Sequence, residues 1–290
     1  MEAMCAITLD HQVHSSGYLG RVPWWSFTKT VLAAASLRLV EGGTLALDAK
    51  VGEAPYTLRQ LLQHEAGLPD YGGLNDYHQA VARGDSPWST EELFERARAD
   101  HLLFAPGEGW AYSNIGYLKV GQLITSVTGE ALDVSVRGLV LCPAGANNAR
   151  LASTPHDLAD VRMGSRGGYH PGWVYHGLIV GPLLDAARVL RSLLAGDLLS
   201  AAVLTEMCRA RPLPQYRAPP WIEPGYGLGL MTPVVPGGRR VFGHTGEGAG
   251  STIAIYGRSG LEGALVAGAW SSREAAANVE AASIEDLVAE

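Results

Sequence analysis

Apolar residues along this chain follow a strand-like pattern near both ends and a helical period in between. Residues 4–9 (MCAITL) and 12–19 (QVHSSGYL) are short and partly β-like, which predicts a hairpin. Residues 25–41 include VLAAASLRLV, a run that is apolar almost all round and predicts a helix buried on most sides. Gly42 and Gly43 are expected to end it.

The middle of the chain, from about residue 57 to 212, is predicted to be mainly helical. Thr57 is a plausible cap for LRQLLQH, and Ser89 or Thr90 precedes EELFERARA as in a capping box. Asn114 precedes IGYLKVGQLITSVTG, whose apolar residues recur every three or four positions. A further helix is expected over 182–195, which opens with proline.

The last part of the chain changes character. The segments YGLGLM, RRVFGHTG, STIAIYG and EGALVAGAW are short, β-rich and separated by Gly or Pro, which predicts consecutive antiparallel strands before a closing helix. We therefore expect an α+β fold: one antiparallel sheet built from both chain termini, flanked by helices, with an inserted, mainly helical lobe. Residues 1–50 and 213–290 would form the sheet lobe and residues 51–212 the helical lobe.

Composition narrows the function classes. The chain has 290 residues, 47% hydrophobic and 18% charged, so a folded globular protein is expected. A net charge of −7 disfavours a nucleic acid or an anionic membrane as partner. No segment approaches the ~20 apolar residues of a membrane span, and the N-terminus does not resemble a secretory signal. The three cysteines are widely spaced, which favours reduced thiols, a cytoplasmic location and no metal or cofactor.

The segment Ser26-Phe27-Thr28-Lys29 is the leading candidate for chemistry. Residues i and i+3 share one face of a helix, with β-carbons ~5–6 Å apart. A serine hydroxyl needs a base beside it, and burial of a lysine amine favours the neutral form that can serve. Alternatively, Lys29 extends its amine to the surface and Ser26 caps the helix. The two-residue pattern alone does not decide between these interpretations.

A second candidate motif is Tyr112-Ser113-Asn114, which lies at a predicted helix start. A tyrosine there can share a proton with the lysine, and an asparagine can hold a substrate amide. The alternative role of Asn114 is to cap the helix.

The third candidate motif is His244-Thr245-Gly246, on a predicted strand and followed by Glu247. A strand with small residues lets a substrate backbone lie alongside and hydrogen-bond to the main chain. The alternative is an ordinary bend in the sheet.

In this order, SxxK, YxN and HTG resemble the signature of the serine β-lactamase and penicillin-binding-protein superfamily. Tyrosine in the second motif and histidine in the third are similar to the class C β-lactamase-related branch. That branch includes D-Ala-D-Ala carboxypeptidases, D-aminopeptidases and β-lactamase-like esterases. The segments EGGTLALDAKV, TLRQLLQHEAGLPDY and GYGLGL also resemble the family, so the resemblance runs along nearly the whole chain.

The resemblance implies a role for each matching residue. Ser26 would attack a carbonyl and form an acyl-enzyme, with Lys29 and Tyr112 as the catalytic base pair. The backbone N–H groups of Ser26 and Glu247 would form the oxyanion hole, and Asn114 would orient the substrate. The resemblance implies a β-lactamase-like fold and a small-molecule substrate, and it leaves the oligomeric state undefined.

Several residues depart from the family pattern or extend it. Histidine has an ordinary pKa near 6.5, so His244 would be mostly neutral at pH 7 and select less for carboxylate-bearing substrates such as penicillins. Glu247 occupies a position that is usually small, and its side chain is expected to point outward. One of Trp24 and Trp25 is expected in the core, and Trp25 and Trp173 are candidates to contact the substrate.

We therefore predict a serine hydrolase that acts on an ester, amide or peptide bond of a small substrate. A protein that binds penicillin or accepts an acyl group without efficient turnover shares the same residues, as does a true β-lactamase. A transacylase would differ only in the acceptor that releases the acyl group. Tyr112 favours turnover, because it supplies a base for deacylation.

Overall fold

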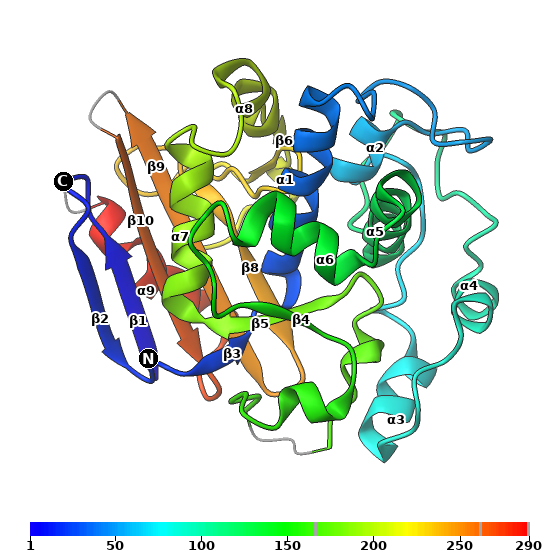
Figure 1. Cartoon of the computed structure of the whole chain (residues 1–290), viewed down its shortest axis with the longest axis horizontal. Helices are drawn as coiled ribbons and strands as arrows, with labels where there is room; N and C mark the ends of the chain where they lie inside the picture. Colours follow the sequence, from blue (N-terminus) through cyan, green and yellow to red (C-terminus); the bar gives the residue numbers. More distant parts are fainter. Residues whose placement is uncertain (165–167, 261–262, 289–290) are drawn as a thin grey trace.

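The computed structural model describes residues 1–164, 168–260 and 263–288. Its largest element is an antiparallel sheet of five strands in the order β2-β1-β10-β9-β8. These are β2 (Val13–Gly17), β1 (Ala3–Ile7), β10 (Gly263–Ser271), β9 (Ser251–Gly260) and β8 (Phe242–Gly248). Segments from near both ends of the chain lie side by side in this sheet, because β1 pairs with β10 (Figure 1).

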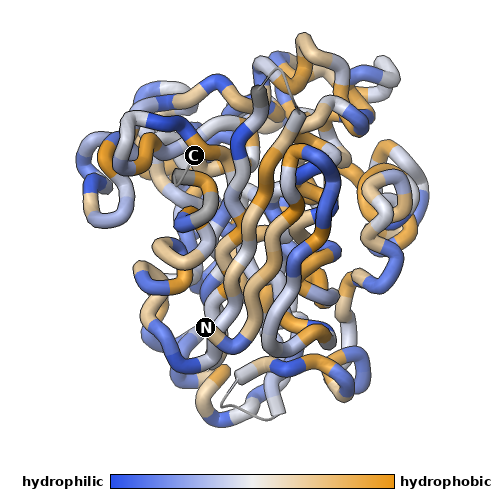
Figure 2. Tube along the Cα trace, turned by 90° about the vertical axis from the view of Figure 1, so that its left-hand side faces the viewer, coloured by the Kyte–Doolittle hydropathy of each residue, from blue (hydrophilic) through white to orange (hydrophobic). Residues whose placement is uncertain are grey.

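Two helices cover the large sheet. Helix α7 (Leu183–Leu194) packs against β1, β9 and β10, and α9 (Ala276–Val288) packs against β9 and β10 on the opposite face (Figure 1). The inner strands carry hydrophobic residues along most of their length (Figure 2), whereas all five residues of the edge strand β2 are exposed. Burial of both faces accounts for the long apolar run of β10.

Helix α1 (Thr28–Glu41) is buried along residues 28–37, and the remaining helices lie beside the sheet (Figure 1). They are α2 (Leu58–Leu62), α3 (Asn75–Arg83), α4 (Thr90–Ala97), α5 (Asn114–Thr128), α6 (Leu132–Val136) and α8 (Ala201–Cys208). A π-helical turn at Arg137–Leu141 continues α6, and short 3-10 turns lie at Trp25–Phe27, Pro155–Leu158, Pro171–Trp173 and Pro214–Tyr216.

Two smaller antiparallel sheets connect these parts. One consists of β3 (Arg21–Pro23), β5 (Leu178–Pro182) and β4 (Arg150–Ala152), in that order. The other pairs β6 (Arg211–Pro212) with β7 (Gly225–Tyr226). In the first sheet, β3 leads directly into the Trp25–Phe27 turn, so its pairing with β5 brings the segment before β5 close to that turn.

The predicted α+β fold is confirmed, with the N-terminal hairpin, the buried helix and the C-terminal strands where the sequence indicated. The division into lobes at residues 50 and 212 stays a prediction. Helix α7 precedes residue 212 but packs on the sheet, so sheet-covering structure begins earlier than that boundary. The segment YGLGLM forms only the two-residue strand β7, and Gly229, with φ 74°, interrupts extended backbone.

Two local expectations at helix starts have different outcomes. Thr57 caps α2 as expected, and it also forms a capping box with Gln60. Asn114 does not cap α5, because the Ser113 hydroxyl accepts a hydrogen bond from the Gly116 amide and Asn114 is the first helical residue. The Asn114 side chain is therefore available for another role. Within the described ranges, none of the helices is both long and apolar enough to cross a bilayer.

Candidate active site

Ser26 lies in the 3-10 turn that leads into α1 and is itself partly exposed. The residue before it, Trp25, has φ 43°, a conformation that non-glycine residues rarely adopt and that carries strain. The Trp25 indole is fixed by a hydrogen bond from Nε1 to the Ser251 hydroxyl (3.1 Å) and by an edge contact with Tyr169. The strained turn presents the Ser26 hydroxyl at the head of a buried helix.

Strand β8 lies against this turn at two glycines. A Cβ on Gly246 would lie 2.7 Å from the Ser26 amide nitrogen, and a Cβ on Gly248 would lie 2.3 Å from the Trp25 ring. Real Cβ atoms do not approach so closely, so glycine at both positions permits the contact. The strand backbone therefore runs directly beside the Ser26 amide, and the exposed Glu247 lies between the two glycines.

Lys29 is fully buried one turn beyond Ser26. Its Nζ lies 3.0 Å from Ser26 Oγ and 2.7 Å from Asn114 Oδ1. Burial lowers the pKa of Lys29 from 10.5 to about 7, although Asp70 acts in the opposite direction. Among the described residues, no carboxylate forms an ion pair with this amine. A substantial fraction of Lys29 is therefore neutral at neutral pH.

Tyr112 lies close to both Ser26 and Lys29. The Lys29 amine is 4.9 Å from the centre of its ring. Burial raises the pKa of Tyr112, while a hydrogen bond with Ser26 acts in the opposite direction. Tyr112 is therefore protonated when Lys29 begins to lose its proton. Because the two groups and Ser26 form one cluster, their titrations are coupled.

Asn114 is held in one orientation by Asp70. The Asp70 carboxylate accepts hydrogen bonds from the Asn114 backbone amide (2.8 Å) and from its side-chain Nδ2 (3.3 Å). The Asn114 carbonyl oxygen is thereby directed at Lys29. Asp70 lies in the TLRQLLQHEAGLPDY segment, but its role was not predicted from the sequence.

His244 belongs to a chain of hydrogen bonds that joins the second and third motifs. The Ser113 amide donates to His64 Nδ1 (3.1 Å), and His64 Nε2 lies 3.2 Å from the Tyr226 hydroxyl. That hydroxyl lies 3.0 Å from His244 Nε2. His244 Nδ1 lies 2.7 Å from the carbonyl oxygen of Thr245. A carbonyl only accepts, so Nδ1 carries the His244 proton and Nε2 accepts from Tyr226.

His244 stays uncharged mainly because it is buried, although its hydrogen bond to Thr245 favours the charged ring. Burial lowers the pKa of His244 to about 3, and nearby Lys29 acts in the same direction. Burial also lowers the pKa of His64 well below its ordinary value. Neither imidazole supplies a positive charge to a ligand at neutral pH.

A cavity of about 930 Å³ opens at Ser26. Its walls are mainly apolar or aromatic and include Trp25, Tyr71, Tyr77, Val81, Ala82, Tyr169 and Val174. Polar lining residues include Asn114, His176 and Glu247. Of the described residues that line the cavity, none is lysine or arginine, and Glu247 is the single carboxylate.

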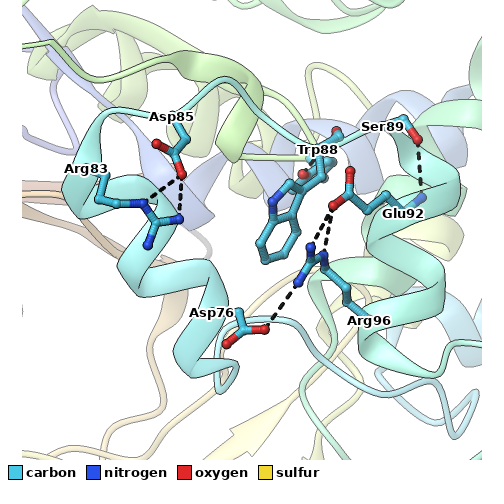
Figure 3. Close-up of polar contacts among 8 residues, drawn as sticks. Asp76, Arg83, Asp85, Trp88, Ser89, Glu92 and Arg96 are labelled. Carbon is cyan, nitrogen blue, oxygen red and sulfur yellow. Dashed lines mark hydrogen bonds and ion pairs between the residues drawn. The ribbon is translucent and has the colours of Figure 1, made fainter.

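Helix α3 forms one wall of this cavity and is connected to α4 through Arg96 (Figure 3). The Arg96 guanidinium pairs with Asp76 on α3 (3.2 Å) and with Glu92 on α4 (2.8 Å), and it lies 4.4 Å from the centre of the Trp88 ring. These charged groups are 39–69% exposed, so each pair contributes at most ~1 kcal/mol. Packing of the aromatic side chains beneath them fixes the wall more than the ion pairs do.

The structure brings Ser26, Lys29, Tyr112 and Asn114 into one cluster, and it places the backbone of Gly246 and Glu247 beside Ser26. Glu247 is exposed but also lines the cavity, so the expectation that its side chain points away from the site stays a prediction.

Thr245 does not line the cavity. Its hydroxyl contacts Glu280 (2.6 Å) and Tyr256 (2.8 Å), so any contact with substrate would have to come from its backbone. His244 is also absent from the lining, and it lies behind Tyr112, with ring centres 6.3 Å apart.

The two tryptophans before Ser26 divide as expected, because Trp24 is fully buried and Trp25 lines the cavity. Trp173 differs from the prediction. It is 1% exposed, packs against Tyr77 and Trp88, and does not line the cavity. The aromatic segment 169–176, which its composition suggested could border the cleft, does reach the cavity, through Tyr169, Val174 and His176.

Comparisons with known proteins support one family. The family described as Beta-lactamase matches residues 8–285. Penicillin-binding protein 4* of Bacillus subtilis (strain 168) is 31% identical over 137 residues, which cover 43% of this chain and 29% of that protein. Esterase EstB of Burkholderia gladioli is 32% identical over 148 residues, which cover 44% of this chain and 38% of the esterase. The chain thus spans well under half the length of these curated relatives.

The fold also matches solved structures over most of its length. A D-stereospecific amidohydrolase from Streptomyces sp. has a TM-score of 0.76 and 25% sequence identity, with 92% of this chain and 88% of that chain covered. The likeness extends through both the sheet and the surrounding helices.

Proposed function

The chain belongs to the Beta-lactamase family, and on this basis we propose that it is a serine hydrolase that cleaves ester or amide bonds of small substrates. The observation that carries the proposal is the 3.0 Å contact between the buried Lys29 amine and the Ser26 hydroxyl. With a pKa of about 7, this amine can act as a base under conditions in which an exposed lysine stays protonated. The similarity to an esterase and to an amidohydrolase supports both bond types.

In the acylation step, neutral Lys29 takes the proton of Ser26 while Oγ attacks the substrate carbonyl carbon. The carbonyl electron pair moves to oxygen, and the amides of Ser26 and Glu247 donate hydrogen bonds to the resulting oxyanion. When the carbonyl reforms, the bond to the leaving alcohol or amine breaks. Tyr112 gives its proton to the leaving group and regains one from the Lys29 ammonium, which leaves an acyl-Ser26 ester.

Deacylation repeats these steps with water in place of serine. The Lys29 and Tyr112 pair removes a proton from water, the hydroxide oxygen adds to the acyl carbon, and Ser26 leaves with a proton returned from the pair. Asn114, fixed by Asp70, keeps Lys29 in place in both half-reactions. No group outside the chain is needed for the proton balance.

The charge of the site supports a substrate that lacks a carboxylate. His244 is neutral, and the described part of the cavity wall has no lysine or arginine to bind an acid. The aromatic and aliphatic walls favour an apolar group next to the scissile bond. We therefore propose uncharged or amine-bearing esters and amides as the substrate class, in preference to penicillins.

A panel of substrates tests this proposal. It comprises neutral p-nitrophenyl esters, D-aminoacyl p-nitroanilides and the carboxylate-bearing β-lactam nitrocefin, each assayed with the wild type and Ser26→Ala. We expect ester or anilide turnover that Ser26→Ala abolishes. Full activity in Ser26→Ala would disprove the central assignment. A much higher kcat/KM for nitrocefin than for the esters would identify a true β-lactamase instead.

Intact mass spectrometry separates turnover from simple acylation. After mixing with a p-nitrophenyl ester, an adduct on the wild type should form and decay within the time of the assay. An adduct that persists would favour the alternative of an acyl-accepting protein without efficient turnover. Added alcohols or amines that accelerate its decay would identify a transacylase.

We also propose a cytoplasmic site of action. The three cysteines, Cys5, Cys142 and Cys208, are all unpaired, which is usual where thiols are kept reduced. Fractionation of the cells that produce the protein, with an antibody against it, tests this location.

A further inference from the structure

The Lys29 amine has a third partner that the mechanism above does not use. His176 Nε2 lies 3.2 Å from Lys29 Nζ, alongside Ser26 Oγ at 3.0 Å and Asn114 Oδ1 at 2.7 Å. His176 is 4% exposed and lines the cavity. It lies just before β5, in the segment that the pairing of β5 with β3 brings to the Ser26 turn.

The number of donors on the amine gives this third contact a meaning. A neutral lysine amine has two N–H bonds and one lone pair. The Asn114 oxygen can only accept, since the Nδ2 group of that side chain donates to Asp70, so it takes one N–H. If His176 Nε2 takes the second N–H, the lone pair is left for Ser26 Oγ. Without a second acceptor, the amine can rotate and direct an N–H at Ser26 instead.

The surroundings keep His176 available as an acceptor. Burial lowers the pKa of His176 well below its ordinary value, and Lys29, His244 and His64 act in the same direction. The Trp25 backbone favours the protonated ring, but burial is the larger effect. The neutral ring presents the lone pair of Nε2 to the amine when its proton is on Nδ1, a buried atom that meets no partner at hydrogen-bond geometry among the described residues.

Other charged or titratable groups that face the amine cannot take over this role. Asp70 is occupied by Asn114 and raises the pKa of Lys29 without contacting it. Tyr112 and Tyr117 present their ring faces, with centres 4.9 and 5.8 Å from Nζ. The Tyr117 hydroxyl donates to the Leu62 carbonyl. His244 and His64 belong to the chain of hydrogen bonds through Tyr226.

We propose that His176 is a positioning residue for Lys29, whose Nε2 accepts one amine N–H and so directs the lone pair of the neutral amine at Ser26 Oγ. This inference rests on the proposed function, because it assigns a role within the same proton transfer. It adds a residue that neither the SxxK, YxN nor HTG motif contains.

Two substitutions with opposite expectations test the proposal. His176→Phe keeps a ring of similar size but has no acceptor, whereas His176→Gln can place its Oε1 near the position of Nε2. The readout is the pH profile of kcat/KM on the best neutral ester. In His176→Phe we expect the plateau to fall about tenfold or more, as for one lost hydrogen bond to a charged or reacting group. The acid limb should move to lower pH, because an ammonium loses more than an amine when an acceptor is removed. His176→Gln should recover the plateau to within about threefold and return the limb toward its original position.

The controls separate this proposal from a merely structural role and from failure of the proposed function. His156→Phe makes the same exchange at an exposed histidine and should leave the profile unchanged. The positioning role would be overturned if His176→Phe and His176→Gln lost the same fraction of kcat/KM and the acid limb of the pH profile did not move. It would also be overturned if the pH profile of His176→Phe matched that of the wild type. Circular dichroism checks folding, and His176→Leu replaces the Phe variant if that variant fails to fold. If Ser26→Ala keeps its activity, the proposed function itself is refuted. If Ser26→Ala is inactive but His176→Phe has the activity and pH profile of the wild type, only this inference is refuted.

Discussion

Replacement of Lys29 by methionine should remove activity and, at neutral pH, make the protein more stable. Methionine has a similar length and no charge, so it fits a fully buried position without the cost of desolvating an amine. The gain should shrink as pH rises, because the wild-type amine becomes neutral in both the folded and the unfolded chain. Stability and its pH dependence therefore report directly on the perturbed lysine.

The magnitude follows from the pKa. Burial lowers the pKa of Lys29 from 10.5 to about 7, and each unit corresponds to 1.36 kcal/mol, so the folded chain loses about 5 kcal/mol below pH 7 relative to a solvated lysine. Between these pKa values the unfolded chain binds the proton and the folded chain does not. The wild-type free energy of unfolding therefore rises with pH in this range. Between pH 7 and pH 9 the free energy of unfolding of the wild type should therefore rise by about 2 kcal/mol relative to that of Lys29→Met.

Urea denaturation followed by tryptophan fluorescence measures this difference at several pH values from 7 to 9. Taking the difference between the two proteins removes the contribution of groups that titrate alike in both. Lys50→Met is the matched control, because it makes the same exchange at an exposed lysine. A flat curve for Lys29→Met would refute the account of Lys29 as a buried base.

Three further outcomes are expected. The kcat/KM of the wild type on a neutral ester should rise with pH and reach half its plateau near pH 7, where Lys29 loses its proton, and a flat profile between pH 5 and 8 would exclude Lys29 as the base. Tyr112→Phe should lower kcat about 10²-fold or more, as measured by stopped-flow acylation, and thermal melts should show no loss of stability. Unchanged turnover in this variant would remove Tyr112 from the proton relay. Gly248→Ala should cost about 1–3 kcal/mol and reduce kcat/KM, because its Cβ displaces the Trp25 ring, whereas Gly138→Ala, which meets no atom within 4 Å, should keep normal activity.

The parts of the site that are close in sequence could be predicted well. Ser26 and Lys29 meet because their spacing is one helical turn, and the start of α2 is capped as the Thr57 pattern indicated. The order of the motifs carried the fold class, since a shared signature implies a shared arrangement of strands and helices. The sequence did not show that Asp70 orients Asn114, because the two residues are 44 positions apart and only the fold brings them together.

The errors concern side chains whose direction depends on distant packing. Trp173 and Tyr169 lie in the same aromatic segment, and nothing in their composition says which of them faces the cavity. Trp173 donates its Nε1 proton to the Asp85 carbonyl and fills the core, whereas Tyr169 meets Trp25. His176 reaches Lys29 only because β5 pairs with β3, a contact between residues about 160 positions apart that local pattern does not encode.

The pairing of β1 with β10 has a consequence for protein synthesis. Ala3 lies opposite Trp270, so β1 has no neighbour on that side until β10 has left the ribosome. Strand β8, which lies against the Ser26 turn, also emerges late. At ~5–20 residues per second, the interval between synthesis of Lys29 and of β8 is roughly 10–45 s. Until β8 has been made, the Ser26 turn lacks the strand whose backbone runs beside the Ser26 amide, so the site is completed only after most of the helices around it.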